Sequence, residues 1–161
     1  MQIVKHRICV ETSVISYLAA RPSADAVSAT RQHFSYQLRQ RRARFDLLIS
    51  DAVLNEIALG DADAAKNRLS YRAEMSRLCL PEHTEVVAQK LLRSKAMPAK
   101  AYIDAVHIAI AALHDVPFIA SCNFRHIAGA LARRRIEVSL AAIGMKVPVF
   151  ATPEEILEGL S

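Results

Sequence analysis

The sequence contains a helical segment that is apolar nearly all the way round and yet holds one acid. Between residues 99 and 113 apolar side chains fill almost every turn, which is typical of a helix buried in a core rather than one on a surface. Asp104 lies inside this segment. Because an unpaired buried carboxylate costs several kcal/mol, Asp104 must be paired, neutralised, bound to a metal, or placed at a helix end that faces a cleft.

A short strand follows this helix and completes half of a βαβ unit. Pro117 ends the helix, residues 118–121 form an apolar run typical of a strand buried on both faces, and Asn123 follows them. A helix that packs on a parallel sheet runs antiparallel to the strands, so it begins at the edge where the strands end. We therefore expect Asp104 and Asn123 to share the edge at which open α/β sheets bind ligands.

Two further acids are predicted at the same edge. Glu11 follows a first strand predicted over residues 3–10, and an alternative interpretation is that Glu11 only complements the dipole of the next helix, predicted over 14–20. Glu56 lies in the helix that follows a second strand, predicted over 45–50, and the antiparallel argument places it at the same edge.

The remaining elements carry no predicted chemistry. Asp51 is interpreted as an N-cap of the helix that ends before Gly60. Residues 152–155 form a capping box that accounts for Glu154 and Glu155. The other predicted elements are helices over 24–42, 61–76 and 84–94, a short helical or irregular piece over 124–132, a charge run at 133–135, and an edge strand over 148–150.

Length and composition predict a single domain spanning residues 1–161. No apolar run reaches the length of a membrane span, and the first ten residues lack the apolar region of a signal peptide, so we expect a soluble, cytoplasmic protein. The three cysteines have no metal-ligand spacing and lie in apolar surroundings, which favours buried, reduced thiols.

The net charge of +5 comes entirely from the N-terminal third of the chain. Residues 1–50 hold eight Lys or Arg against three Asp or Glu, whereas residues 51–161 hold 13 of each. Such an excess fits a polyanionic partner. Five side chains are candidates for contacts to a nucleic acid, with ordinary solvation as the alternative for each: Arg41, Arg42, Arg44, Arg125 and His126.

Glu11, Glu56, Asp104 and Asn123 are thus expected at one edge of one sheet. Three carboxylates close together repel one another unless a cation is present, and carboxylate and amide oxygens are the ligands that Mg²⁺ or Mn²⁺ prefers. Such a site fits the hydrolysis of phosphodiester bonds. Three neighbouring residues complete the expectation: Ser13 and Ser121 orient the acids or cap helices, and His107 is a core histidine bonded to backbone or to a carboxylate.

Four segments, in their order and spacing, resemble the PIN-domain nucleases and particularly the small VapC-like toxins. They are ICVETSVISYL, SDAVLNEI, AYIDAVHIAIAAL and FIASCNFRHIA. The resemblance implies an α/β/α sandwich with a central, mostly parallel sheet, Mg²⁺- or Mn²⁺-dependent endoribonuclease activity on RNA, frequent homodimerisation, and a cognate antitoxin that blocks the site. By position, Glu11, Glu56 and Asp104 match the three core acids of the family, and Asn123 matches its fourth acidic position.

Two positions depart from the family pattern. Glu11 is one methylene longer than the usual Asp, and Asn123 is neutral where the family often has Asp, which favours one well-held metal over two. An inactive PIN-like module that binds RNA or protein therefore stays open. A third interpretation, a flavodoxin-like nucleotide-binding protein, lacks support because the chain has no glycine-rich phosphate loop.

Overall fold

The computed structural model describes residues 4–125, 127 and 129–160, and its centre is a sheet of five parallel strands. The strands lie in the order β3-β2-β1-β4-β5. Their bounds are β1 His6–Val10, β2 Phe45–Ser50, β3 Ser76–Leu78, β4 Phe118–Ala120 and β5 Val149–Ala151. Since β1 pairs with both β2 and β4, the order of the strands reverses beside β1, and that switch point is where ligands bind in open α/β sheets.

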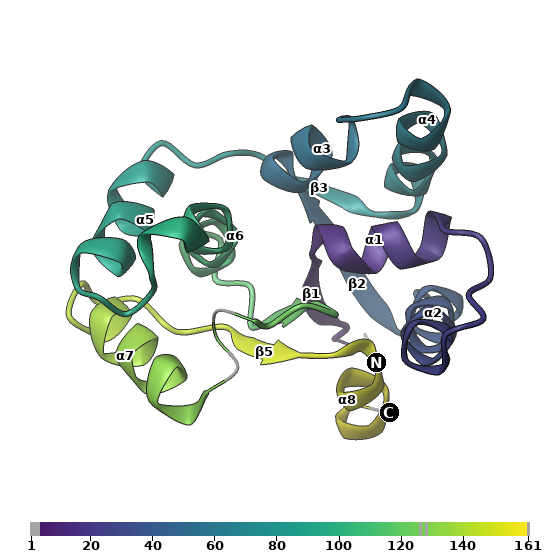
Figure 1. Cartoon of the computed structure of the whole chain (residues 1–161). Helices are drawn as coiled ribbons and strands as arrows, with labels where there is room; N and C mark the ends of the chain where they lie inside the picture. Colours follow the sequence, from purple (N-terminus) through teal and green to yellow (C-terminus); the bar gives the residue numbers. More distant parts are fainter. Residues whose placement is uncertain (1–3, 126, 128, 161) are drawn as a thin grey trace.

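Helices cover both faces of the sheet, as Figure 1 shows. On one side lie α5 (Thr84–Arg93), α6 (Tyr102–Leu113) and α7 (Ala130–Ala141). The remaining helices are α1 Thr12–Ala19, α2 Ala26–Gln40, α3 Asp51–Ile57, α4 Ala62–Ser70 and α8 Pro153–Gly159, with 3-10 turns η1 Tyr71–Glu74 and η2 Ala99–Ala101. The predicted three-layer α/β/α sandwich is confirmed.

Two apolar cores, one on each face, explain why the central strands read as continuous apolar runs. Successive residues of a strand point to opposite faces. Accordingly Cys9 packs with the α5, α6 and α7 side, whereas Ile8 and Val10 pack with the side of α1, α2 and α8. Every residue of α6 from Ala105 to Ala112 is buried, as the apolar pattern of this segment predicts.

The region around β3 differs from the prediction. The expected helix over 61–76 ends at Ser70, and after η1 the chain forms β3, which the sequence analysis missed. The sequence gives little sign of this strand because it has three residues, two of them the exposed Ser76 and Arg77, and it pairs on one side only. Residues 76–78 form a strand because they pair with β2, and no local apolar pattern predicts it.

Two smaller expectations are also corrected, and one stretch that had no predicted element is assigned. The N-cap of α3 is Ser50, whose hydroxyl accepts from the N–H of Val53, and Asp51 instead pairs with Arg77. Cys79 is exposed, so only Cys9 and Cys122 are buried thiols. The unassigned stretch after residue 135 continues α7 to Ala141. The predicted capping box of α8 is confirmed, as is the edge position of β5.

No helix among the described residues is both long and apolar enough to cross a membrane.

Candidate metal centre

Glu11 directly follows β1, the strand beside the switch point. All the hydrogen bonds that hold its carboxylate go to one oxygen. Oε2 accepts from the N–H of Ser13 at 3.0 Å, from the Ser13 hydroxyl, and from the Ser121 hydroxyl at 2.9 Å. The backbone N–H of Cys122 in turn donates to the Ser13 hydroxyl at 2.9 Å. Within the described part of the chain, every hydrogen bond to this carboxylate goes to Oε2, so Oε1 is the oxygen left for a ligand.

Glu11 is also the N-cap of α1. Glu11 therefore does stabilise the start of this helix, as the alternative interpretation has it. Its side chain accepts from the N–H of Ser13, which is one of the first-turn donors without a partner in the helix. The two roles are compatible, since capping uses only one carboxylate oxygen. Ser13 and Ser121 hold the carboxylate from two segments that are far apart in the sequence, as expected.

Glu56 reaches the same edge from α3 and has two partners. The Thr12 hydroxyl donates to Oε2 at 2.7 Å, and Nε2 of His107 lies 2.7 Å from the same oxygen. The His107 contact is an ion pair rather than a well-aligned hydrogen bond, and Nδ1 of His107 is buried with no partner among the described residues. Glu56, like Glu11, thus keeps Oε1 outside its local contacts.

The Glu56–His107 pair favours the charged form of both side chains. Burial raises the pKa of Glu56, but the contacts with His107 and Thr12 outweigh it, so the pKa lies below its ordinary value. Burial lowers the pKa of His107, but the charge of Glu56, with those of Glu11 and Asp104 further away, raises it above its ordinary value overall. The three acids therefore act together on this one buried ring, Glu56 by direct contact and Glu11 and Asp104 from further away.

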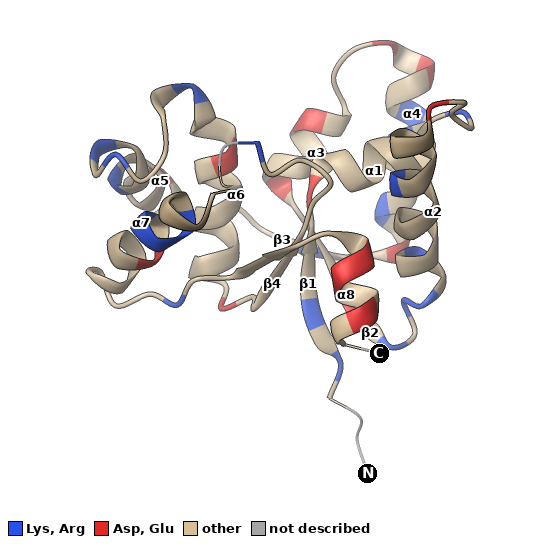
Figure 2. Cartoon of the chain, turned by 60° about the horizontal axis from the view of Figure 1, so that its bottom comes forward, with Lys and Arg blue, Asp and Glu red and all other residues tan. Residues whose placement is uncertain are grey.

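Asp104 lies in the first turn of α6, half-buried, and lines a small cavity at the switch point. The cavity has a volume of about 20 Å³, which is room for about one water molecule. Its polar lining comes from five residues in three segments: Glu11, Asp104, His107, Ser121 and Asn123. In Figure 2, acidic residues gather where α1, α3 and α6 come together. The antiparallel argument for α6 is thus confirmed.

Asn123 is the most exposed of the four predicted ligands. Its backbone N–H donates to the Ser121 hydroxyl at 3.0 Å, which ties the segment to the residue that holds Glu11. Its side-chain Oδ1 accepts a long hydrogen bond of 3.4 Å from the N–H of Arg125. The amide therefore borders the cavity without strong partners of its own.

His107 is not among the ligands predicted from the sequence, although its contact with a carboxylate is predicted. Ligand atoms of Glu11, Glu56 and His107 all lie within 4.8 Å of one another. The signal was the i, i+3 spacing from Asp104, which places both side chains on one side of α6. The hydroxyl of Thr12, which donates to Glu56, is a further contact that the pattern of strands and helices did not predict. The donor set, mainly carboxylate oxygens with an adjacent amide, suits a hard divalent cation such as Mg²⁺ or Mn²⁺.

The structure separates the predicted cationic residues into two groups. Arg44 directly precedes β2, whose first residue pairs with His6 at the start of β1, so Arg41, Arg42 and Arg44 lie at the opposite edge of the sheet from Glu11. That distance is roughly 15 Å along a five-residue strand. Arg125 is exposed two residues after Asn123, on the side of the candidate site. His126 lies outside the described residues.

Comparison with known proteins places the chain in a family. The model of the PIN domain matches residues 8–130, which is well over half of the chain. The chain therefore belongs to the PIN domain family. Its fold is similar to that of a chain in the crystal structure of VapBC2 from Rickettsia felis bound to a DNA fragment from their promoter. The TM-score is 0.57 with 10% identity, over 91% of this chain and 98% of that chain. No curated protein matches in sequence.

Proposed function

We propose that this PIN-domain chain is a divalent-metal-dependent endoribonuclease. The observation that carries the proposal is the gathering of acids at the switch point of the sheet. Ligand atoms of Glu11, Glu56 and His107 lie within 4.8 Å of one another, and Glu11 and Asp104 line the same water-sized cavity. The three acids, Glu11, Glu56 and Asp104, come from three separate segments. Carboxylates that lie close together in a partly buried place repel one another, and a bound cation removes this repulsion. RNA hydrolysis is the reaction that this site and the family support best.

Glu11, Glu56, Asp104 and Asn123 would hold Mg²⁺ or Mn²⁺. When bound, the cation would supply Lewis-acid stabilisation of a phosphodiester and a lowered pKa for water. Glu11 is suited to this task because Ser13 and Ser121 fix one oxygen and leave the other in place, so little ordering is required on binding. His107 fixes Glu56 in the same way and keeps it ionised.

We further propose that the chain is the toxin of a toxin–antitoxin pair, acts on RNA in the cytoplasm, and forms a homodimer. The support is the resemblance of its motifs to VapC-like toxins and the similarity of its fold to a chain of VapBC2. An antitoxin would block the site described above. Size measurement of the purified chain by light scattering tests the dimer, and toxicity of the expressed chain in a bacterial host tests the toxin.

The test of the nuclease proposal is incubation of the purified chain with a pool of single-stranded RNAs, with Mn²⁺ in one series and EDTA in the other. We expect fragments with Mn²⁺ and intact RNA with EDTA. Binding of the RNA without cleavage in either series would instead favour a catalytically inactive RNA-binding module. The feature that favours an inactive RNA-binding module is Asn123, which is exposed and carries no charge at the fourth position.

A further inference from the structure

A larger pocket adjoins the candidate metal centre on the other face of the sheet. It has a volume of about 380 Å³ and lies between the N-terminal half of α2, the segment after β4 and the start of α8. Its lining residues are Ala26, Val27, Thr30, Arg31, Phe34, Cys122, Thr152, Pro153 and Glu154. All three walls lie at the edge where the parallel strands end, since Cys122 follows β4 and Thr152 follows β5.

The pocket and the metal centre share one short segment of chain. Ser121 donates to the carboxylate of Glu11, and the next residue, Cys122, lines the pocket. The N–H of Cys122 donates to the Ser13 hydroxyl, which also bonds Glu11. A molecule in the pocket therefore contacts the residue next to Ser121, and that residue also bonds to Ser13, so the pocket is linked to both serines that hold the proposed catalytic carboxylate.

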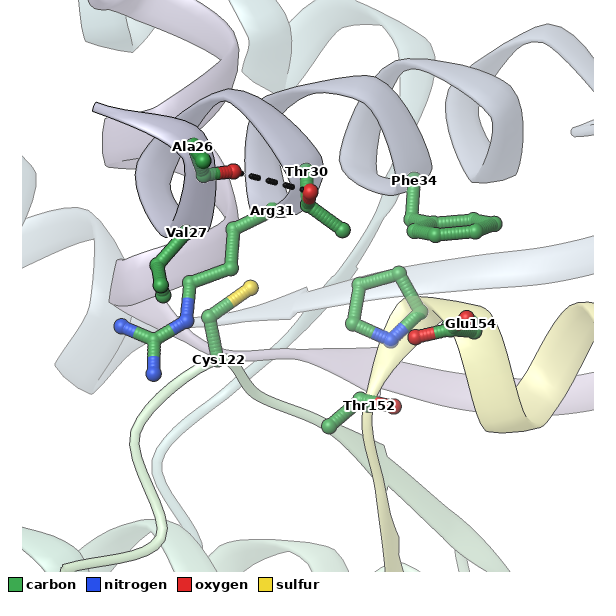
Figure 3. Close-up of a pocket in the computed structure, with 9 residues that line it drawn as sticks. Ala26, Val27, Thr30, Arg31, Phe34, Cys122, Thr152 and Glu154 are labelled. Atoms are coloured by element: carbon green, nitrogen blue, oxygen red, sulfur yellow. Dashed lines mark hydrogen bonds between the residues drawn. The ribbon is translucent and has the colours of Figure 1, made fainter. Parts of the chain in front are cut away.

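The chemistry of the pocket fits a flat ring with a charged neighbour. Figure 3 shows Arg31 and Phe34 at opposite ends, with Cys122 between them and Thr152 and Glu154 on the facing wall. The Phe34 ring is half-buried, packs against the apolar core and lines the pocket, so it supplies an aromatic surface for stacking. Arg31 is positioned by a hydrogen bond of 3.1 Å to the hydroxyl of Tyr17, which leaves most of its donors for an anion.

We infer that this pocket binds the base of a nucleotide next to the scissile phosphodiester. The inference rests on the proposed function for the identity of the ligand as RNA. Phe34 stacks on the base, Arg31 contacts a neighbouring phosphate, and the exposed carboxylate of Glu154 accepts from the polar edge of the base. The volume of the pocket lies within the range of sites for small ligands.

The direct test is binding of the four nucleoside 5′-monophosphates in EDTA, measured by calorimetry and by shifts of amide resonances. Two variants probe the pocket: Thr30→Trp, which fills it from an exposed helical position, and Phe34→Leu, which keeps an apolar side chain but removes the ring. Gln40→Trp, at an exposed position of the same helix away from the pocket, is the matched control. Each variant is first checked by thermal unfolding, and Thr30→Trp is decisive if Phe34→Leu is destabilised.

We expect the wild-type chain to bind at least one of the monophosphates, with resonance shifts at residues that line the pocket. Thr30→Trp should weaken this binding about tenfold, and Gln40→Trp should not change it. Equal affinity in wild type and Thr30→Trp, or no binding of any monophosphate at millimolar concentration, would overturn the inference.

Because this assay requires no cleavage, it separates the pocket from the proposed function. Nucleotide binding that Thr30→Trp weakens, in a chain that cuts no RNA, would support the pocket and contradict the nuclease. Conversely, a chain that cuts RNA with the same preference for neighbouring bases in wild type and Thr30→Trp would keep the nuclease and contradict the pocket. Loss of that preference in Thr30→Trp alone is the result we expect from the cleavage products.

Discussion

Glu11 combines a structural and a proposed chemical role through its two carboxylate oxygens. The network of Ser13 and Ser121 is built around a glutamate, because Oε2 reaches donors that come from both α1 and the end of β4. The family usually has the shorter Asp at this position. In this chain the extra methylene is matched by the surrounding serines, so the departure from the family pattern does not by itself indicate an inactive protein.

This match predicts that Glu11→Asp lowers activity rather than restoring a better enzyme. Asp is a good N-cap, so the stability of the fold should change little, but the carboxylate is drawn back by about one methylene. A misplacement of about 1 Å is expected to lower kcat/KM for RNA about a hundredfold. The control is Glu158→Asp at an exposed position of α8. A rate for Glu11→Asp equal to or above that of the wild type would contradict the assigned geometry.

Asn123 places a neutral amide at the position that matches the fourth acid of the family. Asn123→Asp should raise the affinity for Mn²⁺, because a carboxylate at the border of the cavity adds attraction at short range. A tenfold lower metal requirement corresponds to about 1.4 kcal/mol, a reasonable gain for an exposed position. Calorimetric titration of Mn²⁺ into both proteins measures the difference. Identical affinities would mean that residue 123 neither binds the metal nor borders its ligands.

At the scale of helices and strands, the position of an element within the sheet decides which cations can meet RNA at the site. Arg125 follows β4 on the side of the candidate metal centre, whereas Arg41, Arg42 and Arg44 follow α2 and precede β2 at the opposite edge. The basic excess of the first 50 residues therefore does not surround the acids. Clustering in the sequence did not predict this separation, because the direction of each strand determines it.

We accordingly expect Arg125→Gln to weaken RNA binding in EDTA and to reduce the slope of log K against log salt by about one. Combined replacement of Arg41, Arg42 and Arg44 by Gln should leave most of the slope in place. Fluorescence anisotropy with a labelled single strand at several salt concentrations measures both. A slope that falls only in the triple variant would place the RNA across the opposite edge and remove Arg125 from the path.

Most elements were predictable from the sequence because their local patterns agree with their place in the fold. The all-apolar α6, the strand at 45–50 and the capping box at 152–155 are examples. Two of the failures share a cause, since each depends on a contact between distant segments. β3 exists through its pairing with β2, and Asp51, which was predicted to cap α3, pairs with the distant Arg77 while Ser50 caps the helix. Local sequence contains neither contact.

The same distinction applies to the candidate site. The four predicted ligands follow from strand ends and helix starts, which a parallel topology brings to one edge. The partners of those ligands do not follow so simply. That Thr12 bonds Glu56, and that His107 pairs with Glu56 rather than with a backbone group, depends on how α1, α3 and α6 pack against one another.

At the scale of the whole molecule, the site is a product of topology. Glu11 follows β1, Glu56 lies in the helix after β2, and Asp104 lies at the start of the helix before β4, so only the folded sheet brings them together. In the absence of a cation these charges repel one another. Replacing Asp104 by Asn should therefore leave the fold in EDTA as stable as the wild type or slightly more stable, while the protection given by Mn²⁺ against unfolding is lost.

Comparison of wild type with Asp104→Asn in one RNA cleavage assay, at saturating Mn²⁺ and in EDTA, tests the central claim most directly. Thermal unfolding in EDTA provides the control for folding. The account predicts that the wild type cuts RNA only with Mn²⁺, and that Asp104→Asn melts at the same temperature or slightly higher and cuts nothing. A well-folded Asp104→Asn that cuts RNA at the wild-type rate, or a wild type that cuts equally in EDTA, would contradict it.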